Sequence, residues 1–205
     1  LMNLLTVLLA LAPLQAPPSS EAAYARLKPS LFTIEIHSGN REAKSSLGSG
    51  YIVGPGGLMA TNYHVVASFV DDPVRNQLRA KGEAGEFPLS LVQFDLVHDI
   101  ALVRAAGVSG RPLALATAPP EAGERIISFG NPEGLGMSLI EGNANGFATK
   151  GVVPRLLLSM PLNSGMSGGP ILNSRDEVVG TNVSVQWLSN SLSFGVPTQA
   201  LRDLL

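Results

Sequence analysis

Residues 163–170 read Asn-Ser-Gly-Met-Ser-Gly-Gly-Pro and contain the most informative serine of the 205-residue chain. Glycines lie on both sides of Ser167, so we expect a tight turn that exposes its hydroxyl directly before a strand. The chain contains no cysteine, which excludes disulfides, thiolate metal sites and cysteine nucleophiles. Ser167 is therefore the first candidate for a nucleophile.

The order of residues along the chain separates three kinds of serine hydrolase. Gly165, Ser167 and Gly169 also satisfy G-x-S-x-G, the turn of α/β-hydrolases, but that fold places its histidine after the serine. All the histidines of this chain precede the serine: His37, His64 and His98. A subtilisin-like order needs an aspartate before the histidine, and with His64 as base none is available, because the first aspartate is Asp71. The order His, Asp, Ser remains.

A serine hydroxyl attacks well only when a base takes its proton, and imidazole can accept that proton and return it to a leaving group. We expect His64 to be the base and Asp99 to orient it, because Asp99 is followed directly by the apolar strand Ile-Ala-Leu-Val. Asp95 is the competing acid, and we expect it to cap a turn instead. His98 adjoins Asp99, and neighbours in a strand point to opposite faces, so we do not expect it to be the base.

Short apolar segments bounded by turn residues occupy the rest of the chain. With 22 Gly and 15 Pro, the sequence is interrupted too often for a helix bundle. Helices are expected only at the two ends, one from an N-cap at Ser20 to a stop at Pro29, and one capped by Thr198. The expected strands are residues 31–37, 50–53, 87–95, 100–105, 125–130, 152–160, 170–172, 178–185 and 192–196. This spacing predicts an all-β sandwich or barrels.

Several motifs occur in a fixed order. They are GSGYIV (48–53), ATNYHVV (60–66), DIALV (99–103), GNP (130–132), NSGMSGGP (163–170) and SFGVP (193–197). Together they resemble the HtrA/Deg-type trypsin-like serine proteases. The resemblance implies two antiparallel β-barrels with a short N-terminal and a C-terminal helix: residues 21–112 carry His64 and Asp99, and residues 113–205 carry Ser167. No PDZ domain is expected after the second barrel.

The resemblance implies a serine endopeptidase that cleaves unfolded or damaged polypeptides through an acyl-enzyme on Ser167, without a metal or cofactor. His64 and Asp99 would complete the triad, and the backbone N–H groups of Gly165 and Ser167 would form the oxyanion hole. A homotrimer is implied as well. The alternative is a catalytically inactive protease fold that binds exposed peptides as a chaperone or stress sensor.

The expected specificity pocket contains no acidic residue. By the resemblance, Pro161 lies at its base, with Ser184 and Val185 on one wall, so we expect a small aliphatic P1 residue. The loop also departs from the commoner family form, which has Pro in place of Ser164 and Asn in place of Met166. Neither position is the nucleophile or an oxyanion glycine.

Charge and the first residues bear on partners and location. The formal net charge is -2, only 15% of residues are charged, and no run of Lys or Arg appears, so we expect no nucleic-acid partner. Residues 4–14 form an apolar run that is too short to span a membrane. We expect residues 1–20 to be a signal peptide or leader and the protein to be periplasmic or secreted.

Overall fold

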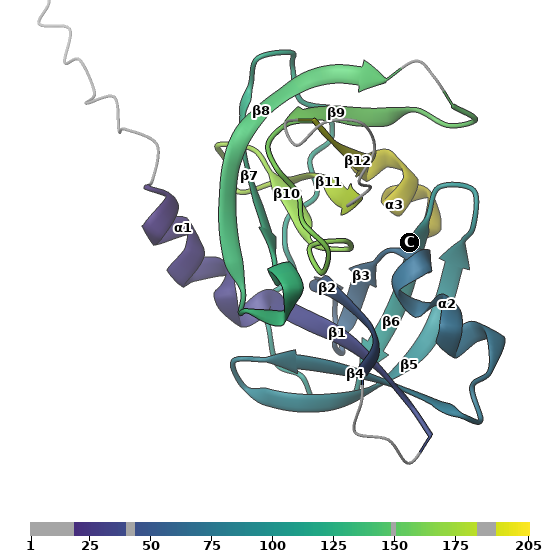
Figure 1. Cartoon of the computed structure of the whole chain (residues 1–205). Helices are drawn as coiled ribbons and strands as arrows, with labels where there is room; N and C mark the ends of the chain where they lie inside the picture. Colours follow the sequence, from purple (N-terminus) through teal and green to yellow (C-terminus); the bar gives the residue numbers. More distant parts are fainter. Residues whose placement is uncertain (1–18, 40–43, 149–150, 184–191) are drawn as a thin grey trace, which may run out of the picture.

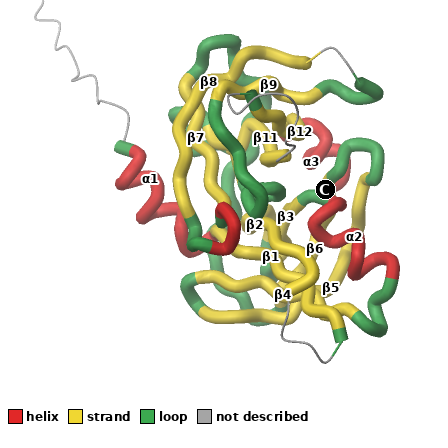
Figure 2. Tube along the Cα trace, viewed as in Figure 1, coloured by secondary structure: helices red, strands yellow, loops and turns green. Residues whose placement is uncertain are grey.

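The computed structural model describes residues 19–39, 44–148, 151–183 and 192–205. Two closed antiparallel barrels of six strands each make up most of this part of the chain, which confirms the predicted fold class (Figure 1). Helices lie at the edges of the two barrels (Figure 2). Among the residues described, no helix is long and apolar enough to cross a membrane.

The first barrel has the strand order β1-β2-β3-β6-β5-β4. Its strands are β1 (Leu31–Ser38), β2 (Lys44–Gly54), β3 (Leu58–Thr61), β4 (Asn76–Gly82), β5 (Gly85–Asp95) and β6 (Ile100–Ala105). Helix α2 (Tyr63–Asp71) begins directly after β3 and contacts β1, β2, β4 and β6. The second residue of α2 is His64, so the helix places this side chain where β3 ends.

The second barrel has the strand order β10-β11-β12-β9-β8-β7. Its strands are β7 (Arg125–Gly130), β8 (Ser138–Ala148), β9 (Arg155–Ser159), β10 (Pro170–Leu172), β11 (Val178–Val183) and β12 (Ser193–Pro197). The remaining elements are α1 (Ser20–Leu27), the 3-10 helices η1 (Lys28–Ser30) and η2 (Pro132–Gly134), and α3 (Thr198–Leu204).

Both helix caps predicted from the sequence are wrong. The N-cap of α1 is Ser19, whose hydroxyl accepts the Ala22 N–H at 3.3 Å. The hydroxyl of Thr198 is drawn away from the start of α3, because it donates to the carbonyl of Val178 at 2.7 Å. Helix α1 ends at Leu27, before Pro29, and Pro29 lies within the 3-10 helix η1 that follows it.

Four elements have no clear signal in the sequence. β4 is mostly polar, β8 is interrupted by Gly and Asn, and β3 has only four residues. Helix α2 contains Val65 and Val66, whose β-branched side chains favour strands over helices. Both valines are buried in the core of the first barrel, so packing rather than local propensity stabilises this helix.

One continuous core joins the barrels and the terminal helices. Its buried members include Leu27 of α1, Ile100 of β6, Phe129 of β7 and Leu201 of α3. The ring of Tyr24 in α1 stacks on Phe129 with the ring centroids 6.0 Å apart, so the helix that precedes the first barrel packs on the second. Each barrel also has its own interior cluster.

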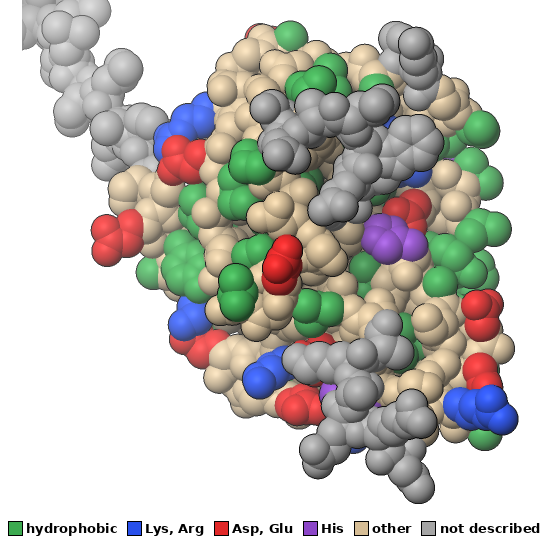
Figure 3. Space-filling view, in the orientation of Figure 1, with side chains coloured by type: hydrophobic (Ala, Val, Ile, Leu, Met, Phe, Trp, Pro, Cys, Tyr) green, Lys and Arg blue, Asp and Glu red, His purple; other side chains and the backbone are tan. Residues whose placement is uncertain are grey.

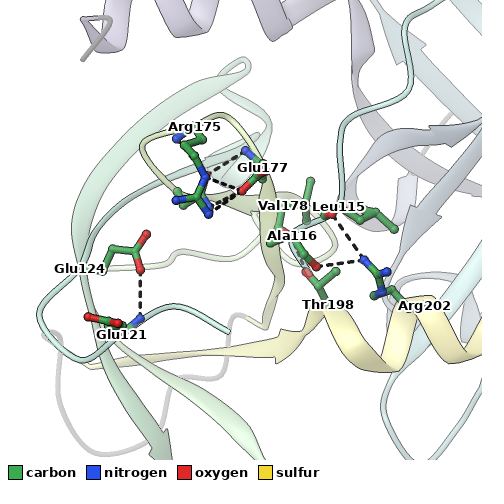
Figure 4. A network of polar contacts seen from close by, with 10 residues as sticks. Leu115, Ala116, Glu121, Glu124, Arg175, Glu177, Val178, Thr198 and Arg202 are labelled. Carbon is green, nitrogen blue, oxygen red and sulfur yellow. Dashed lines mark hydrogen bonds and ion pairs between the residues drawn. The ribbon is translucent and has the colours of Figure 1, made fainter. Parts of the chain in front are cut away.

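The segment that connects the barrels is held by backbone and side-chain bonds (Figure 4). The Ala116 N–H donates to the Val178 carbonyl at 2.9 Å, and the Val178 N–H donates to the Ala114 carbonyl at 2.7 Å. From α3, Arg202 donates to the carbonyls of Leu115 and Ala116 at 3.5 and 3.1 Å. The helix at the end of the described chain therefore anchors the crossover.

A buried polar pair also crosses between the barrels. The hydroxyls of Tyr51 in β2 and Thr181 in β11 are 2.8 Å apart, and both residues are fully or almost fully buried. Burial raises the pKa of the Tyr51 hydroxyl well above its usual range, while the bond to Thr181 opposes the rise. The pair is therefore neutral and depends on its mutual hydrogen bond.

We expect Tyr51→Phe and Thr181→Val each to lower the free energy of unfolding by about 1–3 kcal/mol, because each leaves one hydroxyl buried without a partner. The double variant removes both hydroxyls, so it should lose less than the sum of the two single variants. Urea denaturation of the four proteins measures this cycle. Strictly additive losses would contradict a direct bond between the barrels.

Candidate active site

The carboxylate of Asp99 binds His64 at two points. Its Oδ1 accepts the backbone N–H of His64 at 2.9 Å, and its Oδ2 lies 2.8 Å from the ring atom Nδ1. The first bond satisfies a free N–H of the first turn of α2, where the N-cap residue Asn62 makes no capping bond of its own. The second bond favours a proton on Nδ1, which leaves Nε2 as the proton acceptor.

The two side chains differ in their access to solvent. The His64 side chain is 47% exposed, whereas that of Asp99 is only 17% exposed. Figure 3 shows, to the right of the centre of the face drawn, a histidine side chain at the surface next to an acidic side chain. The imidazole is therefore open to an incoming molecule, and the carboxylate behind it is shielded.

Asp99 has an uncommon backbone conformation, with a φ of 62°. This is the left-handed region, in which Asp is tolerated better than most residues. The carbonyl of Asp99 accepts a hydrogen bond from Asn62 Nδ2 at 2.8 Å. Asn62 was not predicted as a site residue, although it lies two positions before His64 in the same motif.

The competing acid, Asp95, caps a turn, as predicted from the sequence. Its Oδ1 accepts the backbone N–H groups of Val97 and His98 at 2.9 and 3.0 Å. Its Oδ2 lies 2.6 Å from His98 Nδ1. These bonds, led by the one from the His98 backbone, lower the pKa of Asp95 below its usual range despite some desolvation. The His98 ring is thus directed to Asp95, and His64 is the partner of Asp99.

Two glycines allow the backbone conformation of residues 163–170, the serine loop. Gly165 has a φ of 89° and Gly168 a φ of 85°, both in the region that side chains disfavour. A Cβ at Gly165 would lie 2.2 Å from the Asn131 carbonyl oxygen, and one at Gly168 would lie 2.2 Å from the Ser49 carbonyl oxygen. Neither position can accept a larger residue without a shift of the backbone.

Ser49 of the first barrel connects the serine loop to the other half of the site. Its N–H donates to the Ser167 carbonyl at 2.7 Å, and its hydroxyl donates to the Gly165 carbonyl at 2.7 Å. Its own carbonyl accepts the hydroxyl of Thr61, the last residue of β3. The loop is thereby held against the strand end from which α2 and His64 begin.

The expectation that the loop exposes its serine is wrong. Ser167 is 4% exposed, because the loop packs between the barrels instead of projecting from one of them. On one side lie Ser49 and Thr61, and on the other Asn182, whose carbonyl accepts the Gly168 N–H at 3.0 Å. The glycines around Ser167 indicate a tight turn, but the sequence does not show which residues of the other barrel cover that turn.

The peptide between Ser164 and Gly165 has a fixed orientation. The Ser164 carbonyl accepts the Glu133 N–H at 2.8 Å. In a trans peptide the N–H points opposite to the carbonyl, so the Gly165 N–H is directed away from Glu133. Glu133 and the neighbouring Asn131, which donates its N–H to the Ser49 hydroxyl at 3.0 Å, were not predicted.

Met166 stands where the commoner family loop has Asn. Its side chain is fully buried in the core of the second barrel. A Cβ at Gly130 would lie 2.7 Å from the Met166 Cα, so β7 and the loop are in close contact. An apolar side chain therefore anchors the loop at the position next to Ser167.

The expected specificity pocket is described only in part. Pro161 is exposed and lies between Met160 and Leu162. The backbone on both sides of Pro161 is held by the Ser193 hydroxyl, which donates to the Met160 carbonyl at 2.6 Å and accepts the Leu162 N–H at 3.1 Å. The other two predicted residues, Ser184 and Val185, lie outside the described residues. Within the described ranges, no group of three or more His, Asp or Glu side chains could hold a metal ion.

Known relatives share the protease domain. A probable periplasmic DegP-like serine endoprotease of Pseudomonas fluorescens is 30% identical over 172 residues, which cover 80% of this chain and 35% of that protein. The mitochondrial serine protease HTRA2 of Bos taurus is 29% identical over 180 residues, which cover 80% of this chain and 37% of that protein. The chain thus matches little more than a third of the length of these relatives.

A solved structure has the same fold. The active form of the Rv3671c protease from M. tuberculosis superposes with a TM-score of 0.78 at 18% identity, over 97% of this chain and 92% of that chain. The model of the trypsin-like peptidase domain matches residues 48–180, which is more than half of the sequence. The chain therefore belongs to the trypsin-like peptidase domain family and is an HtrA-type member of it.

Proposed function

We propose that the protein is a serine endopeptidase in which Ser167, His64 and Asp99 form the catalytic triad. The observation that carries this proposal is the double contact of one carboxylate with the backbone N–H and the ring of His64. A carboxylate in this place fixes the tautomer and stabilises the imidazolium that forms during attack. Loss of such a partner with the geometry retained costs about 10⁴ in rate.

The proposed reaction has two halves. Ser167 Oγ forms a bond to the scissile carbonyl carbon while His64 Nε2 takes the hydroxyl proton. The tetrahedral intermediate then expels the amine, which receives that proton from His64, and an acyl-enzyme remains. In the second half, a water molecule loses a proton to His64 and attacks the ester carbon of the acyl-enzyme. The tetrahedral intermediate then expels the Ser167 oxygen, which receives the proton from His64, and the carboxylic acid is released.

We assign the oxyanion hole to the backbone N–H groups of Gly165 and Ser167. The bond between Glu133 and the Ser164 carbonyl supports this assignment, because it fixes the peptide plane that carries the Gly165 N–H. Preorganised donors of this kind cost no reorganisation during the reaction, and one donor contributes roughly 3 to 4 kcal/mol to transition-state stabilisation.

Unfolded or damaged polypeptides are the proposed substrates. The exposed side chain of His64 and the names of the two relatives described above, a serine endoprotease and a serine protease, support a polypeptide substrate. A homotrimer stays a prediction from the family resemblance.

We expect a fluorophosphonate probe to label the wild-type protein at one site and to leave Ser167→Ala unlabelled, since only an activated serine reacts with it. Intact-mass spectrometry reads the adduct, and unfolded casein serves as the substrate. Equal labelling of the two proteins would remove Ser167 from the mechanism. Suppressed casein aggregation without fragments would support the inactive peptide-binding fold instead.

The proposed P1 residue is small and aliphatic: Val, Ala, Leu or Ile. By the family resemblance we propose Pro161 at the base of the pocket and Ser184 and Val185 on its wall, and none of these residues carries a charge that could neutralise a charged P1 side chain. A peptide library cleaved by the protein should therefore show fragments ending in these residues. A profile dominated by Arg, Lys or Glu would contradict this pocket.

Residues 1–20 are proposed to direct export. The apolar run at 4–14 supports this, as does the periplasmic designation of the Pseudomonas fluorescens relative. Expressed in a Gram-negative bacterium, the protein should fractionate with the periplasm and lack the apolar run when its N-terminus is sequenced. Recovery in that fraction with Met2 retained would contradict a cleaved signal.

A further inference from the structure

Arg155 makes a hydrogen bond that crosses from the second barrel to the turn carrying Asp99. It is the first residue of β9, and its Nη1 donates to the carbonyl of His98 at 2.7 Å. In Figure 1 the turn between β5 and β6 extends from the first barrel towards α3, and contacts between α3 and β5 agree with that view. The bond therefore joins the two barrels beside the site.

The carbonyl that Arg155 binds belongs to the peptide that enters Asp99. The orientation of this peptide sets φ of Asp99, which is 62°. The left-handed region is disfavoured for residues with a side chain, although Asp tolerates it better than most, so contacts from outside the turn help to hold it. Arg155 provides one such contact, at the His98 carbonyl on the N-terminal side of Asp99. Asn62 provides another, at the Asp99 carbonyl.

Other bonds make the rest of this turn rigid. Asp95 caps the N–H groups of Val97 and His98, and it also binds the His98 ring. The turn is therefore expected to move as a unit, and the carbonyl of His98 is a point at which a side chain of the second barrel holds it. A displacement at this point would be transmitted to the Asp99 carboxylate.

The charge of Arg155 suits this place. Burial lowers its pKa from the ordinary value, while the negative charges of Asp99 and Asp95 oppose that change. A guanidinium remains protonated under such conditions, so it is a permanent donor. Its charge-assisted bond to a carbonyl is stronger than a neutral one.

We propose that Arg155 is a positioning residue for the triad: by holding the His98 carbonyl, it fixes the conformation of Asp99 and so the orientation of His64. The proposal rests on the proposed peptidase function. It predicts that the alignment of the His64–Asp99 pair depends on a residue of the opposite barrel, 56 positions from Asp99 and outside every family motif quoted above.

The test compares Arg155→Met, which loses the donor, with Arg155→Lys, which keeps a charged donor. Arg202→Met is the matched control, because it also loses guanidinium bonds to carbonyls between elements, at Leu115 and Ala116. We expect Arg155→Met to lower kcat about 10- to 100-fold with KM within twofold, as for a small misplacement of a catalytic group. Arg155→Lys should recover part of the loss, and Arg202→Met should retain wild-type kcat.

A second readout does not depend on turnover. The proton between His64 Nδ1 and the Asp99 carboxylate should give a downfield NMR signal in the wild type, assigned by its absence in His64→Gln. We expect this signal to shift or broaden in Arg155→Met and to stay in place in Arg202→Met. An unchanged signal, or a kcat in Arg155→Met equal to that of Arg202→Met, would overturn the proposal. Failure of the proposed function would appear separately, as a wild type that neither labels nor cleaves.

Discussion

The site depends on Ser49, a buried residue of β2 that bonds to both halves of the molecule. Its N–H and hydroxyl bind the carbonyls of Ser167 and Gly165, and its carbonyl accepts the hydroxyl of Thr61. If the barrels packed in a different register, these polar groups would be buried at the interface without partners, which costs more than the bonds gain. The barrels therefore meet in one register, and that register brings the serine loop to the start of α2.

Asp99 combines a structural and a chemical role. One carboxylate oxygen caps the first turn of α2, and the other orients the His64 ring. The helix start and the ring are therefore aligned by the same group, so a displacement of the Asp99 carboxylate would disturb both the helix cap and the orientation of the imidazole. This arrangement explains why α2 needs no capping side chain from Asn62, which is free to bind the Asp99 carbonyl.

The fold and the triad candidates follow from the order of motifs in the sequence, but several features of the site do not. Chain order selected His64 as the base, and the apolar strand that follows Asp99 selected this acid over Asp95. Helix α2 was missed because its valines favour strands. The burial of Ser167 depends on residues of the other barrel. Arg155 stands outside any motif, and its contact with His98 exists only after both barrels have folded.

Met166 gives the serine loop an anchor without charge. Its side chain is fully buried among the apolar residues of the second barrel, directly before Ser167. An ion pair in this position would weaken with added salt and would be lost when one partner titrates. A thioether in an apolar core has no such dependence, so the hold of Met166 on the loop does not change with ionic strength or acidity.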